Sequence, residues 1–163
     1  MTGSGNVFVL LGSNLGDRTA ILQQARQMIS ENAGTILSQS SIYETEPWGL
    51  LDQPAFLNQA IEIDTAEEPE SLLKILLQTE QELGRIRKVR WGARLIDIDI
   101  LYYKDLVQYS PALILPHPRL HQRNFALIPL AEIAPEFLDP KSGKTVAQLL
   151  AACPDVSVVS KIS

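Results

Sequence analysis

The chain has 163 residues, of which 45% are hydrophobic and 20% are charged, a composition typical of a folded globular protein rather than a disordered one. Its net charge of −5 argues against a general nucleic-acid-binding protein, because such proteins carry excess positive charge. One cysteine, Cys153, excludes an internal disulfide framework and fits a reducing cytoplasm, and no apolar run is long enough to span a membrane. We therefore expect a single cytoplasmic domain covering residues 1–163.

The first part of the chain is predicted to form a strand, a helix and two further strands. Residues 7–11 are apolar throughout, which predicts a buried strand. A helix follows between Asp17, a suitable N-cap, and Gly34, a suitable terminator, with apolar residues at helical spacing between them. Residues 35–43 and 56–63 alternate in character, which predicts two strands that pair antiparallel. One face of the latter strand is predicted to carry Phe56, Asn58, Ala60 and Glu62.

The middle of the chain completes this pattern with a helix and a strand. Pro69 suits the first turn of a helix that ends at Gly84. The apolar face of that helix is predicted to comprise Leu72, Leu73, Leu76, Leu77 and Leu83. The apolar run of residues 95–101 then predicts a central strand. The order β-α-β-β-α-β is that of the ferredoxin-like fold, an α+β arrangement in which helices cover one face of a four-stranded antiparallel sheet.

The C-terminal residues are expected to cover part of the remaining sheet face. Residues 115–118 predict an extended turn, because two prolines flank one histidine there. Residues 124–133 predict a short helical stretch that is kinked or restarted at Pro129, and residues 145–152 predict a final small helix.

Two aspartates interrupt the last predicted strand. Asp97 and Asp99 lie two residues apart, and side chains alternate along a strand with a period of two, so both carboxylates point to one face. Ile96, Ile98 and Ile100 then point to the other face and fill a core. Two adjacent carboxylates on a buried strand are costly without cations, and carboxylates are ligands of magnesium. The alternative is a solvated sheet face with salt-bridge partners.

Positive charge is concentrated in two short segments. Five of the 14 basic residues fall within ten positions, and they are Arg85, Arg87, Lys88, Arg90 and Arg94. A second cluster consists of His117, Arg119, His121 and Arg123. Because arginines bind phosphate oxygens, two such clusters and a carboxylate pair favour phosphoryl or pyrophosphoryl transfer from a metal–nucleotide complex. A non-catalytic ferredoxin-like module that binds nucleotide or RNA is the competing interpretation.

Five segments of the chain together resemble one known family. They are Gly12-Ser13-Asn14; Tyr43-Glu44-Thr45-Glu46-Pro47-Trp48-Gly49; Phe56-Leu57-Asn58; Arg90-Trp91-Gly92-Ala93-Arg94-Leu95-Ile96-Asp97-Ile98-Asp99-Ile100; and Leu115-Pro116-His117-Pro118-Arg119 continuing to Ala134-Pro135. This pattern resembles the hydroxymethyldihydropterin pyrophosphokinases of folate biosynthesis, over nearly the whole chain to about residue 140. The resemblance implies the ferredoxin-like fold and transfer of pyrophosphate from ATP to 6-hydroxymethyl-7,8-dihydropterin, with release of AMP.

The resemblance also implies a role for individual residues. Asp97 and Asp99 would hold two magnesium ions on the ATP triphosphate, and Arg85 and Arg94 would act as catalytic residues that stabilise the pyrophosphoryl group in transfer. ATP would also be bound by Glu80, Arg87, His117 and Arg123. The pterin substrate would contact Thr45, Trp48, Phe56, Asn58, Trp91 and Phe125. The general base is left open between Asp99, a metal-bound water and no base. We expect small-molecule substrates only, with no nucleic-acid or membrane partner, and a monomer.

Overall fold

The computed structural model describes residues 5–14, 16–46, 55–84 and 96–162. Within these ranges the α-helices are α1 Arg18–Asn32, α2 Pro69–Gly84, α3 Asn124–Ile133 and α4 Val146–Ala151, and a short 3-10 helix, η1, spans Leu120–Gln122. The strands are β1 Val7–Ser13, β2 Thr35–Gln39, β3 Tyr43–Thr45, β4 Phe56–Asp64, β5 Asp97–Tyr103, β6 Gln108–Tyr109, β7 Ile114–Leu115 and β8 Val159–Lys161. Among the described residues, no helix combines the length and the hydropathy that a membrane-spanning segment needs.

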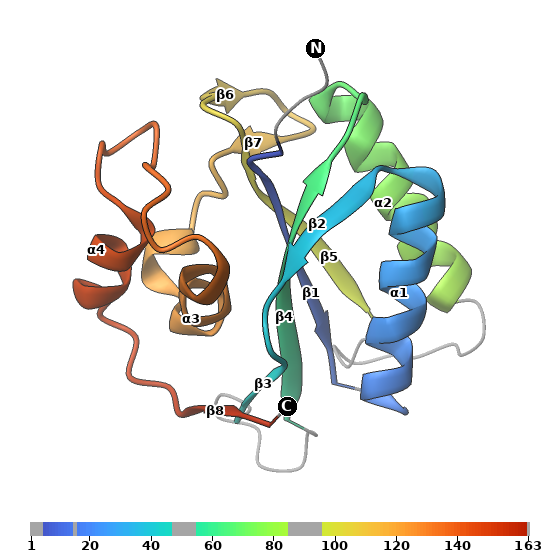
Figure 1. Cartoon of the computed structure of the whole chain (residues 1–163), viewed down its shortest axis with the longest axis horizontal. Helices are drawn as coiled ribbons and strands as arrows, with labels where there is room; N and C mark the ends of the chain where they lie inside the picture. The colour runs from blue at the N-terminus through green and yellow to red at the C-terminus, as the bar shows by residue number, and fades with distance from the viewer. Residues whose placement is uncertain (1–4, 15, 47–54, 85–95, 163) are drawn as a thin grey trace.

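Six of these strands form one antiparallel sheet (Figure 1). Their order is β5-β1-β4-β3-β8, and β2 pairs with β4 beside this path. β1 lies between β5 and β4 and is buried along its whole length, as its apolar sequence predicts. The short strands β6 and β7 pair with each other in a separate ribbon.

The helices α1 and α2 cover one face of the sheet (Figure 1). α1 begins where the sequence predicts, because the Asp17 side chain accepts a hydrogen bond from the Ala20 amide at 3.2 Å. The core between this layer and the sheet includes Leu22, Ile29, Ile61, Leu72, Leu76, Ile98 and Ile100. Leu77, which was predicted to face this core, is instead 48% exposed. The buried stripe of α2 passes through Thr79, whose hydroxyl is satisfied by the Ile75 carbonyl at 2.9 Å.

The helices α3 and α4 lie on the opposite face of the sheet, so the C-terminal residues do cover it (Figure 1). Phe8 of β1 packs edge-on against Phe137, with ring centroids 5.0 Å apart. The Tyr102 hydroxyl of β5 donates to Asp139 Oδ2 at 2.7 Å, beneath this layer. α3 continues through Pro129 as one helix, so the predicted restart does not occur. Pro129 is buried, and packing against the sheet therefore compensates for the amide that proline lacks.

The strand predicted at residues 35–43 is divided into two. β2 ends at Gln39 and β3 begins at Tyr43. Ser40 lies between them and replaces the regular ladder with its own contacts. Its amide donates to the Ala60 carbonyl at 2.8 Å, and its hydroxyl accepts from the Ala60 amide at 3.0 Å. β3 therefore forms a separate short segment that runs along the start of β4.

β5 begins two residues later than the predicted run of residues 95–101. A register shift in its pairing with β1 lets both Leu101 and Tyr102 join the core beneath α3 and α4. Toward the start of β5 the sheet continues beyond this core. Asp97 lies opposite Gly12 of β1 there, and this is where the candidate site is found.

Candidate active site

A cavity of about 310 Å³ lies between the sheet and the start of α3. It is lined by Leu10, Gly12, Thr45, Glu46, Phe56, Asn58, Asp97, Asp99, Arg123 and Phe125. β1, β3, β4 and β5 supply the sheet side of this cavity, and the first residues around α3 supply the other side. Seven residues that the sequence assigned to metal, ATP or pterin therefore meet in one cavity.

The carboxylates of β5 form the acidic part of the lining. Asp97 and Asp99 both line the cavity, whereas Ile98 and Ile100 are buried in the core on the opposite side of the strand. The predicted separation of the two faces is confirmed. Glu80 of α2 accepts a hydrogen bond from the Ile98 amide at 2.6 Å. Glu80 thus binds the backbone of the strand between the two aspartates and does not itself line the cavity.

The start of α3 supplies a cation and an aromatic ring. The guanidinium of Arg123 lies 5.6 Å from the centroid of the Phe125 ring, within the range of a cation–π interaction. Asn124 fixes this end of the helix, because its amide donates to Asp155 Oδ2 at 3.1 Å and its side chain donates to the Ser157 carbonyl at 2.9 Å. The cavity is therefore faced by a positive charge and a flat apolar surface in fixed positions.

The strands β3 and β4 supply a wall that is part aromatic and part polar. Thr45 pairs directly with Phe56 across the two strands, and both line the cavity together with Asn58. Thr45 is 5% exposed, and its Oγ1 has no hydrogen-bond partner among the described residues. Buried polar atoms are normally paired, so this hydroxyl is suited to hydrogen-bond a ligand in the cavity.

Sequence reasoning did not assign Leu10, Gly12 and Glu46 to the site, although all three line the cavity. Gly12 lies opposite Asn58 in the β1–β4 ladder, and a Cβ at Gly12 would lie 2.8 Å from Asn58 Oδ1. Glycine in a buried strand often marks a close approach of this kind, but the predicted strand ended at residue 11, whereas β1 continues to Ser13.

His117 lines a neighbouring cavity of about 430 Å³ rather than the cavity that contains Arg123. Its amide donates to the Leu101 carbonyl at 3.0 Å, which fixes it beside β5. Burial of the imidazole, followed by the positive charges of Arg123 and Arg119, lowers the pKa of His117 to about 4. The side chain is therefore neutral at neutral pH.

We expect His117 to make the folded chain less stable as the pH falls. Its folded pKa lies below the ordinary value of about 6.5, so the unfolded chain binds more protons between about pH 6.5 and pH 4. Above this window His117 is neutral in both states and costs no stability, and the free energy of unfolding decreases as the pH falls through the window. Urea unfolding at about pH 7 and pH 5 should show that wild type loses about 1–2 kcal/mol more than His117→Asn, the lower figure allowing for solvent screening of the partly exposed imidazole. Equal losses in the two proteins would contradict the assignment.

Several predicted site residues lie outside the described residues. They are Trp48, Arg85, Arg87, Trp91 and Arg94. Their roles stay predictions from the sequence.

A cavity lined by two carboxylates, a cation and aromatic rings has the size and the mixed polar and apolar lining of a small-molecule site. The sequence profile of 7,8-dihydro-6-hydroxymethylpterin-pyrophosphokinase (HPPK) matches residues 8–135. The 2-amino-4-hydroxy-6-hydroxymethyldihydropteridine pyrophosphokinase of Bacillus subtilis is 49% identical over 127 residues, which are 77% of this chain and 76% of that protein. The protein of the same name from Methylorubrum extorquens is 44% identical over 142 residues, covering 86% and 89% of the two chains. The chain belongs to the HPPK family.

A solved structure has the same fold. The crystal structure of Plasmodium falciparum HPPK-DHPS matches 93% of this chain with a TM-score of 0.76 at 16% sequence identity. The matched region is 46% of that chain, so this chain spans about half the length of that protein.

Proposed function

We propose that this chain transfers pyrophosphate from ATP to 6-hydroxymethyl-7,8-dihydropterin and releases AMP, as a step of folate biosynthesis. Membership of the HPPK family makes the chain a pyrophosphokinase, which is a transferase. The observation that carries the assignment at the site is the meeting of Asp97 and Asp99 with Arg123 and Phe125 in one cavity.

The carboxylate pair suits magnesium carried by a nucleotide. Magnesium is usually bound through one or two carboxylates together with phosphate oxygens and water. Asp97 and Asp99 provide two carboxylates on one face, and among the described residues no group of three or more histidine, cysteine or acidic side chains forms a closed metal site. We infer that the two aspartates hold two magnesium ions on the ATP triphosphate. When bound, the ions would neutralise the charge that develops on the transferred group.

The opposite part of the cavity suits the pterin. Its flat ring would stack on Phe125, and its polar edge would meet Asn58 and the Thr45 hydroxyl, which has no partner among the described residues. Phe56 would close the same pocket. A buried donor or acceptor that only the correct ring satisfies provides specificity. From the family resemblance, Trp48 and Trp91 would complete this pocket.

The phosphate chain would lie between these two parts. Arg123 provides a positive charge in the cavity, and neutral His117 can hydrogen-bond a phosphate oxygen from the side of its own cavity. Glu80 would support the nucleotide site through the backbone of β5. By resemblance to the family, Arg87 would bind ATP, and Arg85 and Arg94 would stabilise the pyrophosphoryl group. The pterin hydroxyl would attack the β-phosphorus, which makes AMP the leaving group.

We also infer that the sheet with α1 and α2 is the ferredoxin-like fold. The order β5-β1-β4, followed by β2 and β3 beside β4, supports this if β2 and β3 are counted as one interrupted strand. The chain would act as a monomeric, single-domain cytoplasmic enzyme with small-molecule substrates and no nucleic-acid partner.

One assay tests the proposed function. The chain is incubated with ATP, magnesium and 6-hydroxymethyl-7,8-dihydropterin, and the nucleotides are separated. AMP is expected in equal amount to the pyrophosphorylated pterin, and none is expected when the pterin is omitted. Formation of ADP would indicate transfer of a single phosphoryl group, and absence of any product would leave a binding module as the better interpretation.

Replacing Gly12 with alanine is expected to weaken pterin binding selectively. The new methyl group would displace the Asn58 amide, whose Oδ1 lies 2.8 Å from the Cβ position, and the nearest backbone atom is 3.9 Å away. Loss of a buried hydrogen bond costs about 1–3 kcal/mol, so we expect the KM for the pterin to rise about tenfold while that for ATP changes less than about twofold. Steady-state kinetics with each substrate varied in turn would measure both values.

The double variant provides the control for this displacement. In an Asn58→Ala background the amide is absent, so Gly12→Ala should add little to the KM for the pterin. Additive effects would mean that Gly12 acts on the cavity by another route.

A further inference from the structure

Arg18 occupies a position that is unfavourable for its own helix. It is the first residue of α1, and a helix N-terminus carries partial positive charge, so a cation there destabilises the helix. The N-cap carboxylate of Asp17 offsets part of this charge, but no acidic residue lies within the first turn itself. The contacts of the Arg18 side chain give a reason for an arginine at this position.

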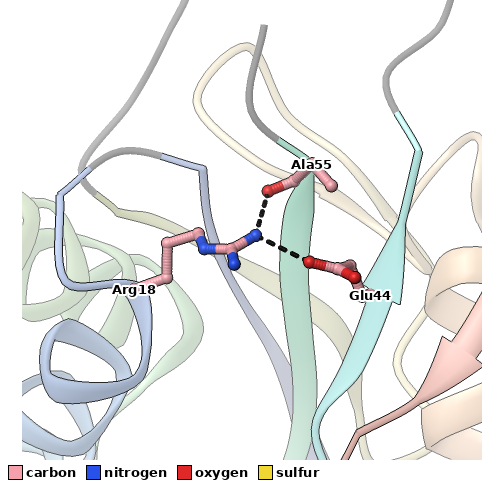
Figure 2. A network of polar contacts seen from close by, with 3 residues as sticks. All are labelled: Arg18, Glu44 and Ala55. Carbon is pink, nitrogen blue, oxygen red and sulfur yellow. Dashed lines mark hydrogen bonds and ion pairs between the residues drawn. The ribbon is translucent and has the colours of Figure 1, made fainter.

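The guanidinium of Arg18 joins two strands (Figure 2). Its Nη1 donates to Glu44 Oε2 at 3.0 Å and to the Ala55 carbonyl oxygen at 2.7 Å. Glu44 belongs to β3, and Ala55 directly precedes β4. One nitrogen atom thus connects the end of β3 to the beginning of β4, two segments that lie side by side in the sheet.

These two contacts flank a wall of the cavity. Thr45 follows Glu44, Phe56 follows Ala55, and Thr45 and Phe56 form the last pair of the β3–β4 ladder. Both of these residues line the cavity, whereas Arg18 does not. Neighbouring side chains of a strand point to opposite faces, so Glu44 reaches toward α1 while Thr45 faces the cavity. Arg18 therefore contacts this end of the β3–β4 ladder on the face of the sheet opposite the cavity.

The strand β3 pairs with β4 on one edge and with β8 on the other. It is only three residues long, and so short a strand depends on tertiary contacts for its position. At its opposite end the Tyr43 hydroxyl donates to Glu132 of α3 at 2.6 Å. On the α1 side, Arg18 contacts β3 at Glu44, beside Thr45, which lines the cavity.

We propose that Arg18 is a positioning residue for the pterin: by holding Glu44 and the Ala55 carbonyl it sets the spacing of the Thr45–Phe56 pair that forms the pterin-binding wall. The assignment of this wall to the pterin rests on the proposed function. The contact of Arg18 with the end of the ladder does not.

The kinetic test compares two arginines of the same helix. Arg18→Met removes both contacts and keeps a long apolar stem. Arg26→Met is the matched control, because Arg26 also lies on α1 and donates to β4, at Gln59 Oε1 and 2.6 Å, away from the cavity. In Arg18→Met we expect the KM for the pterin to rise about fivefold, with kcat and the KM for ATP within about twofold of wild type. Arg26→Met should leave both KM values unchanged. An unchanged pterin KM in Arg18→Met, or an equal rise in the two variants, would overturn the proposal.

Hydrogen exchange tests the structural part independently of catalysis. Amides of residues 43–45 and 56–58 should exchange faster in Arg18→Met than in wild type and in Arg26→Met, because the end of the ladder opens more often. Exchange that is unchanged in Arg18→Met overturns the positioning role even if the enzyme is active. Absence of AMP formation by wild type, together with the expected exchange, would instead count against the proposed function and not against the contact.

Discussion

Asp97→Asn is expected to lower kcat by at least about a thousandfold while the chain keeps its fold. Asparagine has nearly the size of aspartate, so the packing of β5 between the cavity and the core is preserved. It lacks the negative charge, and a neutral amide is a much weaker ligand for magnesium than a carboxylate. The triphosphate would then lack the counter-charge that it needs in the transition state. Formation of AMP under saturating substrates measures the loss, and urea unfolding measures the stability.

The same substitution at Asp105 is the control. Asp105 is exposed in the turn that follows β5, so Asp105→Asn removes one charge close in sequence without reaching the cavity. It should retain wild-type activity. Retained activity in Asp97→Asn would show that the carboxylate pair is structural, as in a solvated sheet face with salt-bridge partners.

The faces of the sheet could be predicted because the alternation of side chains depends only on strand geometry. Residues 56–63 illustrate this. Leu57 and Ile61 are buried beneath α1 and α2, whereas Ala60 is buried beneath the α3 and α4 layer. Asn58 follows the same rule and lines the cavity, as Asp97 does from β5. Once a segment is recognised as a strand, a period of two is enough to place its side chains.

The short strands could not be predicted from the sequence. β8 has three residues and pairs with β3, more than a hundred positions earlier in the chain. β6 and β7 have two residues each and depend on each other. Such segments are too short for a periodic pattern, and tertiary contacts decide whether they form. The division of the second predicted strand has a similar cause, since Ser40 provides hydrogen bonds that its polarity alone did not reveal.

Residues whose side chains carry recognisable chemistry were easier to assign to the candidate site than residues that matter through the space or position they occupy. Charged and aromatic side chains such as Asp99, Arg123 and Phe125 carry recognisable chemistry, and all three line the cavity. Gly12 carries none and acts only through the space that it leaves for Asn58. The placement of His117 in an adjoining cavity depends on how the chain folds back from β7 onto β5, which is a tertiary property.

Gly34→Ala is expected to lower the free energy of unfolding by about 3 kcal/mol, near the upper end for overpacking a close contact. Gly34 links α1 to β2, and a Cβ there would overlap the Asp64 carbonyl oxygen and lie 3.1 Å from the Thr65 Cα. These are backbone atoms, so no side chain can rotate away. Thr65, which directly follows β4, also holds this strand end against the end of α1, because its hydroxyl donates to the Ala33 carbonyl at 2.6 Å. Separating them to admit a methyl group would strain this hydrogen bond and the adjacent end of the β2–β4 ladder.

Gly84→Ala provides a matched control for this loss. Gly84 is the last residue of α2, and apart from its own helix and chain neighbours no atom of the described residues lies within 4 Å of the position that its Cβ would take. The same substitution there should leave stability unchanged or raise it by about 0.4–1 kcal/mol, because alanine restricts the unfolded chain more than glycine does. Urea unfolding of both variants gives the comparison. A similar loss in the two would mean that the general cost of replacing glycine, and not the contact with Asp64, sets the stability of the α1–β2 connection.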